Sequence, residues 1–211
     1  MADVLQKIAT NLYHGETEEV VELVQQALDA GIAPGEVLNG ALLAGMDEVG
    51  RDFKAGDLFV PEVLIAARAM QAGMGVLRPL LADSDIASSG KYVVGTVKGD
   101  LHDIGKNLVK MMLEGGGFET IDLGTDVEPS AFVDAVREHK PDLVGMSAML
   151  TTTMTQMKTT IEALEEAGLR DSVKIMIGGA PVTAAFAEQI GADAYSPDAG
   201  SAVDMARELK G

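Results

Sequence analysis

The stretch YVVGTVKGDLHDIGKN, residues 92–107, decides how the C-terminal half of this 211-residue chain folds. A β-branched apolar run, a polar loop and a helical pattern follow one another within it. This succession predicts a buried strand that leads through a tight loop into a helix, which is the first unit of a parallel sheet. Such a loop requires only a glycine and a capping residue, so Asp100 and His102 indicate a function.

The same alternation of strand and helix patterns continues to the C-terminus. Further strands are expected at 118–124, 143–148, 173–179 and 192–196, and helices at about 105–115, 129–138, 153–167, 182–190 and 200–210. Strands that alternate with helices predict a parallel sheet covered on both faces. Two common sheets fit this count, the flavodoxin-like order 2-1-3-4-5 and half of a Rossmann sheet.

The N-terminal part shows only helical periodicity. Apolar stripes predict helices around 5–12, 20–28, 34–55 and 61–77, with Gly31 and Gly56 as helix ends and Pro34 in a first turn. Short connections between amphipathic helices are typical of a four-helix bundle. The small and polar segment LADSDIASSG, residues 81–90, separates the two parts. We therefore expect a helical domain at 1–86 and a Rossmann-like domain at 87–211.

Composition limits the classes of partner. The formal net charge of −17 disfavours nucleic acid and anionic membrane surfaces, which both need clustered Lys and Arg. The chain has no cysteine, which excludes disulfides and thiolate metal sites. It begins without a recognisable secretory signal. No apolar run approaches the roughly 20 residues of a membrane span. A cytoplasmic location is expected.

The unusual loops are expected to converge on one edge of the sheet. In the order 2-1-3-4-5, ligands bind outside the carboxyl ends of the strands, between the first and third. His102 can act there as a base or a metal ligand, and Asp100 can fix its tautomer. A single histidine cannot complete a zinc site, so a metal at His102 must bring most of its own ligands.

Simpler interpretations exist for each part. Asp103 can cap the following helix, the hydroxyls of residues 151–153 can cap the next one, and Gly178–Gly179 can form a tight turn. A flavodoxin-like domain that is phosphorylated on Asp100 or Asp103 is a further alternative, although it leaves His102 unexplained.

The spacing of these motifs resembles a known signature. Asp100-x-His102-x-x-Gly105, Ser147-x-Met149 and Gly178-Gly179 resemble the D-x-H-x-x-G, S-x-L and G-G motifs of corrinoid proteins, with methionine in place of the usual leucine. GMDEVGRDFKAGDLFVPEV, residues 45–63, is similar to the helical cap of cobalamin-dependent methionine synthase and its corrinoid-protein relatives. The resemblance covers nearly the whole chain and implies a four-helix-bundle cap followed by a Rossmann-like domain.

In that family cobalamin binds in the base-off/His-on form, which implies that His102 is the lower axial ligand of cobalt. Asp100 would bond to the other imidazole nitrogen, and Thr153 would extend this relay. The resemblance implies a larger set of cofactor-binding residues: Asp100, His102, Asp103, Ile104, Gly105, Ser147, Met149, Leu150, Thr151, Thr153, Gly178 and Gly179, with Met46, Phe53 and Val60 of the cap over the methyl group.

The resemblance also implies a function. A cap and a cobalamin domain of this length look like the corrinoid subunit of a three-component methyltransferase system, as used for methanol, methylamines, glycine betaine and methoxyaromatics. Such a subunit is a carrier that takes a methyl group from a substrate:corrinoid methyltransferase to a second methyltransferase acting on tetrahydrofolate or coenzyme M, and a reductive activase serves it. The alternatives are a cobalamin sensor or storage protein without methyl transfer, and the free small subunit of an adenosylcobalamin mutase.

Overall fold

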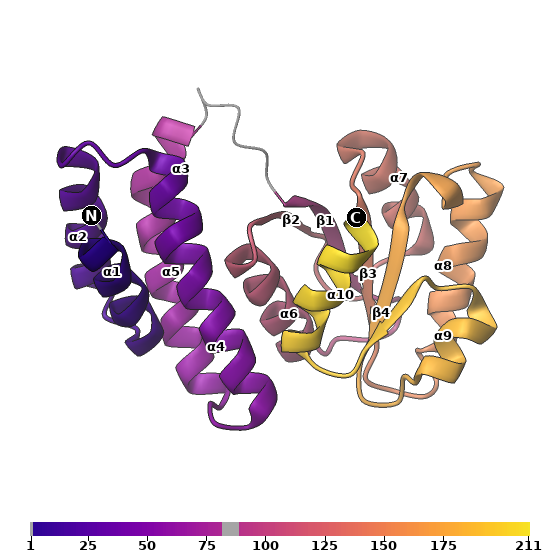
Figure 1. Cartoon of the computed structure of the whole chain (residues 1–211). Coiled ribbons are helices and arrows are strands. Elements are labelled where there is room, and N and C mark those ends of the chain that lie inside the picture. Colours follow the sequence, from indigo (N-terminus) through magenta and orange to yellow (C-terminus); the bar gives the residue numbers. More distant parts are fainter. Residues whose placement is uncertain (1, 82–88) are drawn as a thin grey trace. The chain divides into compact units, whose positions relative to one another are not determined.

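The computed structural model describes residues 2–81 and 89–211. These residues form two compact units, one of N-terminal helices together with Gly115–Gly117 and one that comprises the rest of the C-terminal part (Figure 1). The boundary expected between residues 86 and 87, and most of the polar segment around it, lie outside the described residues.

The helical unit begins with α1 (Ala2–His14) and α2 (Thr17–Asp29), as the apolar stripes predict. The long helix expected next consists of three consecutive segments, α3 (Pro34–Val37), the π-helical η1 (Leu38–Leu43) and α4 (Ala44–Ala55). Pro34 lies in its first turn, and Gly56 ends it in the left-handed conformation, at φ 84°. The π-helical turn was not expected, because its apolar residues are also spaced as an ordinary α-helix requires.

The last helix of this unit, α5 (Val60–Leu81), packs against α2. A Cβ on Gly73 would lie 3.1 Å from a methyl carbon of Val20 and 3.0 Å from one of Leu42, so this glycine permits the close approach of the helices. By length and composition alone, α5 is long and apolar enough to cross a membrane. Because its buried residues include Val63, Met70 and Leu77, we interpret it as the core helix of the unit.

The C-terminal unit is a five-stranded parallel sheet between two layers of helices. Its strands are β1 (Gly90–Thr96), β2 (Phe118–Asp122), β3 (Leu143–Ser147), β4 (Lys174–Gly178) and β5 (Ala194–Ser196). Their order is β2-β1-β3-β4-β5, which confirms the flavodoxin-like alternative. Its helices are α6 (Ile104–Gly115), α7 (Pro129–His139), α8 (Thr155–Glu166), α9 (Ala184–Ile190) and α10 (Ala199–Lys210), with a short 3₁₀ turn, η2 (Arg170–Ser172), before β4.

The two helical layers leave the carboxyl ends of the strands free. Figure 1 shows α6 and α10 on one side of the sheet and α7, α8 and α9 on the other. On the second side, Phe132 of α7 and Ile161 of α8 share a buried core with Val144 and Ile175 of the sheet. Since each helix returns the chain to the start of the next strand, the loops from strand to helix all lie at one edge.

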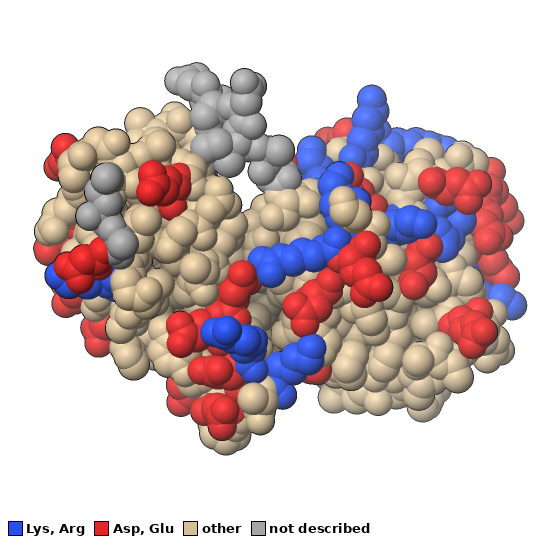
Figure 2. Space-filling model, viewed as in Figure 1, with Lys and Arg blue, Asp and Glu red and all other residues tan. Residues whose placement is uncertain are grey.

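On the face drawn in Figure 2, charged side chains are spread rather than gathered. Figure 2 shows one face, on which Asp and Glu side chains occur on both units and Lys and Arg lie among them. Over the described part of this face, no large basic surface of the kind that phosphate backbones require is present.

Candidate functional site

The loop between β1 and α6 buries one side chain and exposes the next ones. Asp100 is completely buried, whereas Leu101 and His102 lie at the surface. The loop is held by a hydrogen bond of 3.1 Å from the Asp100 N–H to the Val97 carbonyl and by one of 2.9 Å from the Thr96 hydroxyl to the His102 carbonyl. The backbone thus fixes both the carboxylate and the imidazole at the carboxyl end of β1.

The Asp100 carboxylate accepts four hydrogen bonds. His102 donates to Oδ1 twice, from ring nitrogen Nδ1 at 2.7 Å and from its backbone N–H at 3.1 Å. The Met149 N–H, at 2.8 Å, and the Thr153 hydroxyl, at 2.6 Å, donate to Oδ2. Loops that follow β1 and β3 therefore meet on one buried carboxylate, and the Asp-x-His pair and the threonine singled out from the sequence belong to a single hydrogen-bonded group.

These contacts determine the charge of Asp100. Burial by itself raises the pKa of the carboxyl, but the hydrogen bonds from Thr153, Met149 and His102 outweigh it and hold the pKa well below its usual range. Asp100 is therefore ionised at neutral pH. Because an ionised carboxylate can only accept hydrogen bonds, Nδ1 of His102 carries the proton of this contact, and Nε2 is the ring nitrogen left to offer a lone pair to a metal.

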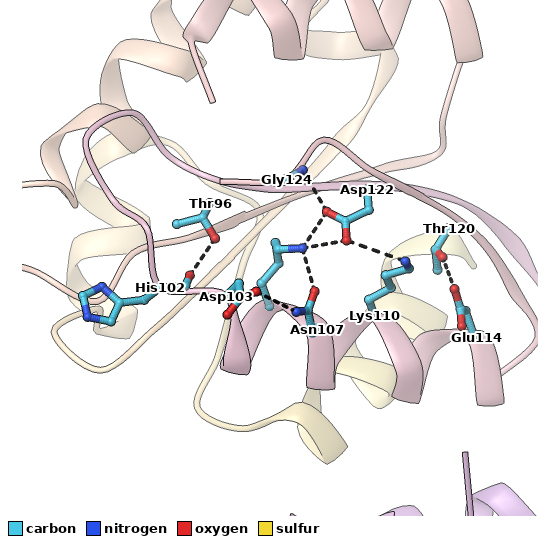
Figure 3. Close-up of polar contacts among 10 residues, drawn as sticks. Thr96, His102, Asp103, Asn107, Lys110, Glu114, Thr120, Asp122 and Gly124 are labelled. Atoms are coloured by element: carbon cyan, nitrogen blue, oxygen red, sulfur yellow. Dashed lines mark hydrogen bonds and ion pairs between the residues drawn. The ribbon is translucent and has the colours of Figure 1, made fainter. Parts of the chain in front are cut away.

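The imidazole of His102 presents that lone pair outward. Its side chain is 55% exposed, and in Figure 3 the ring points away from α6. Among the described residues, no group of three or more His, Asp or Glu side chains could hold a metal ion. A metal at Nε2 would therefore arrive with other ligands already in place.

Exposed apolar side chains occur on both of the loops that meet at Asp100. After β1, Leu101 of the loop and Ile104 at the start of α6 lie close to His102 in the sequence and are 73% and 77% exposed. On the loop after β3, Met149, whose N–H bonds Asp100, and the next residue, Leu150, are 49% and 44% exposed. Large apolar side chains that are exposed on neighbouring loops are typical of binding surfaces. These side chains offer apolar contacts to a ligand that reaches both loops. Leu101 was not identified from the sequence, although a leucine in an otherwise polar loop was a signal for it.

The three motifs meet at the carboxyl edge of the sheet. Ser147 pairs in register with Thr96 on one side and with Gly178 on the other. Gly179 has φ 123°, and a Cβ there would lie 1.9 Å from the Ala148 carbonyl oxygen, so the fold itself requires this glycine. Gly105 differs, because a Cβ there would meet nothing within 4 Å. Packing within the described part of the protein therefore gives no reason for Gly105.

The remaining candidates are less closely tied to the histidine. The Asp103 carboxylate accepts a hydrogen bond of 3.2 Å from the Asn107 amide, and its backbone carbonyl accepts the Asn107 N–H at 2.8 Å. Thr151 is exposed. In the helical unit Met46 is buried, Phe53 is half-buried and Val60 is 37% exposed.

Two residues near these candidates in the sequence escaped the sequence analysis. Phe59, directly before Val60, is 68% exposed, which makes it the most exposed large apolar side chain described in the helical unit. In the other unit Lys106, one residue after Gly105, is buried, with 3% exposure. A lysine in the first turn of a helix carries no sequence signal of burial.

A parallel sheet whose carboxyl edge presents one oriented imidazole and an apolar surface defines a ligand-binding α/β protein of the flavodoxin-like class. Comparison with known proteins agrees with this class and narrows it. A family described as B12 binding domain matches residues 90–204, and a second family with the same description matches residues 4–78. Together the two matches span both units.

Individual proteins are similar over almost the whole chain. The dimethylamine corrinoid protein of Methanosarcina barkeri is 44% identical, over 98% of this chain and 97% of that protein. The methanol:cobalamin methyltransferase complex of Methanosarcina barkeri contains a chain that is 32% identical, with a TM-score of 0.89 over 99% of this chain and 80% of that one. A cobalamin-binding protein of Desulfitobacterium hafniense is 35% identical, with a TM-score of 0.81 over 97% of this chain and 98% of that one. The chain belongs to the family of corrinoid proteins with a B12 binding domain.

Proposed function

We propose that this protein binds cobalamin with Nε2 of His102 as the lower axial ligand of cobalt and carries a methyl group between two methyltransferases. The observation that supports the proposal most is the Asp100 carboxylate. It is buried and ionised and bonds Nδ1 of His102 at 2.7 Å, so Nε2 is the ring nitrogen left to bind a metal.

The residues at this edge suit such a cofactor. Cobalamin brings a cobalt ion already held by the ring nitrogens of its corrin, which matches a site with one histidine. The exposed side chains of Leu101, Ile104 and Met149 offer apolar contacts to the rim of a macrocycle. The open space at Gly105 leaves room for it beside the start of α6.

When bound, cobalamin supplies a cobalt centre that can accept a methyl group and release it again. The residues of this chain bind and orient that centre. Asp100 and Thr153 keep the proton on Nδ1 of His102, and Ser147, Gly178 and Gly179 would border the nucleotide tail. We assign Met46, Phe53 and Val60, all of the helical unit, to shielding the methyl group from water.

The proposed partners are those of a three-component system. A substrate:corrinoid methyltransferase would load the methyl group, a second methyltransferase would pass it to tetrahydrofolate or coenzyme M, and a reductive activase would restore the cofactor after oxidation. We favour a methylated amine as donor, because a relative named for dimethylamine is 44% identical and the chain from the methanol complex is 32% identical.

The experiment that tests the proposal combines binding with transfer. The purified protein is reconstituted with cobalamin, reduced, and incubated either with dimethylamine and a dimethylamine:corrinoid methyltransferase or with methanol and a methanol:corrinoid methyltransferase, while the visible spectrum reports methylation. Wild type and the matched control His139→Ala, which changes a histidine at the end of α7, should be methylated from dimethylamine, whereas His102→Ala should not. A protein that binds cobalamin but is methylated with neither donor would contradict the proposed donor and favour the alternative of a sensor or a store.

A further inference from the structure

Lys106 of α6 is a buried cation outside the Asp100–His102 group. Its Nζ lies 2.6 Å from both carboxylate oxygens of Asp122, at the end of β2, and 2.7 Å from the side-chain oxygen of Asn107. Figure 3 labels the two residues that supply these acceptors, Asp122 and Asn107, and draws dashed lines from their side-chain oxygens. A buried ion pair adds little net stability, because the loss of hydration offsets the attraction between the charges. The position of the pair therefore matters more than its strength.

Two chains of hydrogen bonds connect this ion pair with the backbone around His102. On one side the oxygen of the Asn107 amide accepts a hydrogen bond from Lys106, and the nitrogen of the same amide donates to the Asp103 carboxylate at 3.2 Å. On the other side Asp122 accepts the Gly124 N–H at 2.9 Å, and the Gly124 carbonyl accepts the Thr96 N–H at 3.0 Å. The second chain ends where the Thr96 hydroxyl donates to the His102 carbonyl, a bond that Figure 3 shows.

A second lysine of α6, Lys110, pairs with the same carboxylate and serves as a comparison for Lys106. Lys110 lies one turn further along α6, 3.6 Å from the same Asp122 carboxylate, with a side chain that is 29% exposed. It ties α6 to the end of β2 while remaining partly in contact with water. Lys106 differs in that it also bonds the Asn107 oxygen, and this bond orients the Asn107 amide so that its N–H groups face Asp103.

We propose that Lys106 is a positioning residue for the axial ligand: with Asp122 and Asn107 it fixes the first turn of α6, and thereby the backbone of residues 102–103, so that Nε2 of His102 stands at a defined place. This inference rests on the proposed role of His102 as the ligand of cobalt. It assigns the Lys106–Asp122 pair to ligand geometry, separately from the Asp100 carboxylate that sets the tautomer of the ring.

The test uses the double variant Lys106→Met/Asp122→Asn. It removes both charges together, so neither is left buried alone, and the amide introduced at position 122 still offers an oxygen to the Gly124 N–H. Lys110→Met is the matched control, because it removes a positive charge that pairs with the Asp122 carboxylate but leaves the Lys106–Asn107 hydrogen bond in place. Thermal unfolding of all three proteins shows whether each variant folds.

Two readouts follow. In the protein without cofactor, hydrogen exchange of the Asn107 N–H, which is bonded to the Asp103 carbonyl at 2.8 Å, should be at least about tenfold faster in the double variant than in wild type and Lys110→Met. In the protein loaded with Co(II) cobalamin, the electron paramagnetic resonance signal split by an axial nitrogen should weaken, and cobalamin affinity should fall roughly tenfold or more.

The outcomes separate this inference from the proposed function. A folded double variant with wild-type exchange at Asn107 overturns the inference, whatever wild type binds. The inference is also overturned if exchange rises but the axial-nitrogen signal and the cobalamin affinity equal those of wild type. If wild type itself takes up no cobalamin, the proposed function fails and with it the role assigned to Lys106 in ligand geometry.

Discussion

The hydroxyl of Thr153 donates a hydrogen bond of 2.6 Å to the Asp100 carboxylate, and the two residues are 53 positions apart in the sequence. The bond joins the loop after β1 to the loop after β3, and it leaves the other carboxylate oxygen for His102. Because Asp100 is fully buried, each donor to it replaces a water molecule that the carboxylate has lost. The orientation of the exposed imidazole thus depends on a buried contact between distant segments.

Loss of the Thr153 hydroxyl should therefore be costly. Thr153→Val keeps the shape of the side chain but leaves Oδ2 of Asp100 with the Met149 N–H as its remaining donor. We expect the free energy of unfolding to fall by about 1–3 kcal/mol, as for other buried polar groups that lose a partner. Denaturant titration measures it, and Thr153→Ser, which retains the donor, should stay close to wild type. Equal losses in the two variants would contradict the role of the hydroxyl.

The tautomer of His102 should depend on Asp100. In Asp100→Asn the negative charge that favours a proton on Nδ1 is gone. The NH₂ of the new amide must also face a hydrogen-bond donor, because both carboxylate oxygens of Asp100 accept hydrogen bonds. We expect the ¹⁵N chemical shifts of the imidazole to show a mixture of tautomers and cobalamin affinity to fall about 10–100-fold. Unchanged ring shifts would show that the carboxylate does not hold the ring.

Acid should destabilise the protein through the same carboxylate and that of Asp122. The pKa of Asp122, like that of Asp100, is lowered in the folded chain, because hydrogen bonds from Lys106 and Gly124 and the charge of Lys106 outweigh its burial. A carboxyl whose folded pKa lies below its unfolded value of about 3.9 contributes stability above that value and loses it as the pH falls toward the folded pKa.

The free energy of unfolding should accordingly decrease as the pH is lowered from about 5 to 3, where protons bind the unfolded chain first. Asp100→Asn should show a shallower decrease, since one of the responsible groups is missing. Unfolding in urea at a series of pH values measures both slopes. A variant slope as steep as that of wild type would show that Asp100 contributes nothing to the pH dependence.

Two glycines of the motifs should respond in opposite ways to alanine. Gly179→Ala places a Cβ 1.9 Å from the Ala148 carbonyl oxygen at a positive φ, so we expect a loss of more than about 4 kcal/mol or failure to fold. Gly105→Ala meets open space and should leave the melting temperature unchanged or slightly raised, while weakening cobalamin binding. Thermal melts and cobalamin titrations decide this. A Gly105→Ala protein with wild-type affinity would show that no ligand approaches Gly105.

Much of the fold could be predicted from local patterns. Each strand and helix of the C-terminal unit lies within a few residues of its predicted range, because apolar periodicity and glycine positions are local properties. The observed strand order is one of the two orders expected from the sequence, because right-handed connections between parallel strands permit few strand orders. The π-helical turn at Leu38–Leu43 had no such signal, because the spacing of its apolar residues fits both kinds of helix.

The site was predictable where its residues form a motif and not where they meet only in space. Asp100 and His102 stand two positions apart, so their contact could be inferred from the chain. The pairing of Lys106 with Asp122 spans 16 positions and depends on how α6 packs beside β2, which no local pattern encodes. The exposure of Ile104 is likewise a property of the folded loop rather than of the sequence.

The central claim is that Nε2 of His102 binds cobalt, and isotope labelling tests it most directly. Protein labelled with ¹⁵N-histidine is loaded with unlabelled cobalamin, reduced to Co(II), and measured by electron paramagnetic resonance. Because ¹⁴N splits each cobalt line into three and ¹⁵N into two, we predict doublets in the labelled protein, triplets in the unlabelled one, and no doublets in labelled His102→Ala. Triplets that persist in the labelled protein, from the benzimidazole of the cofactor, would contradict the account.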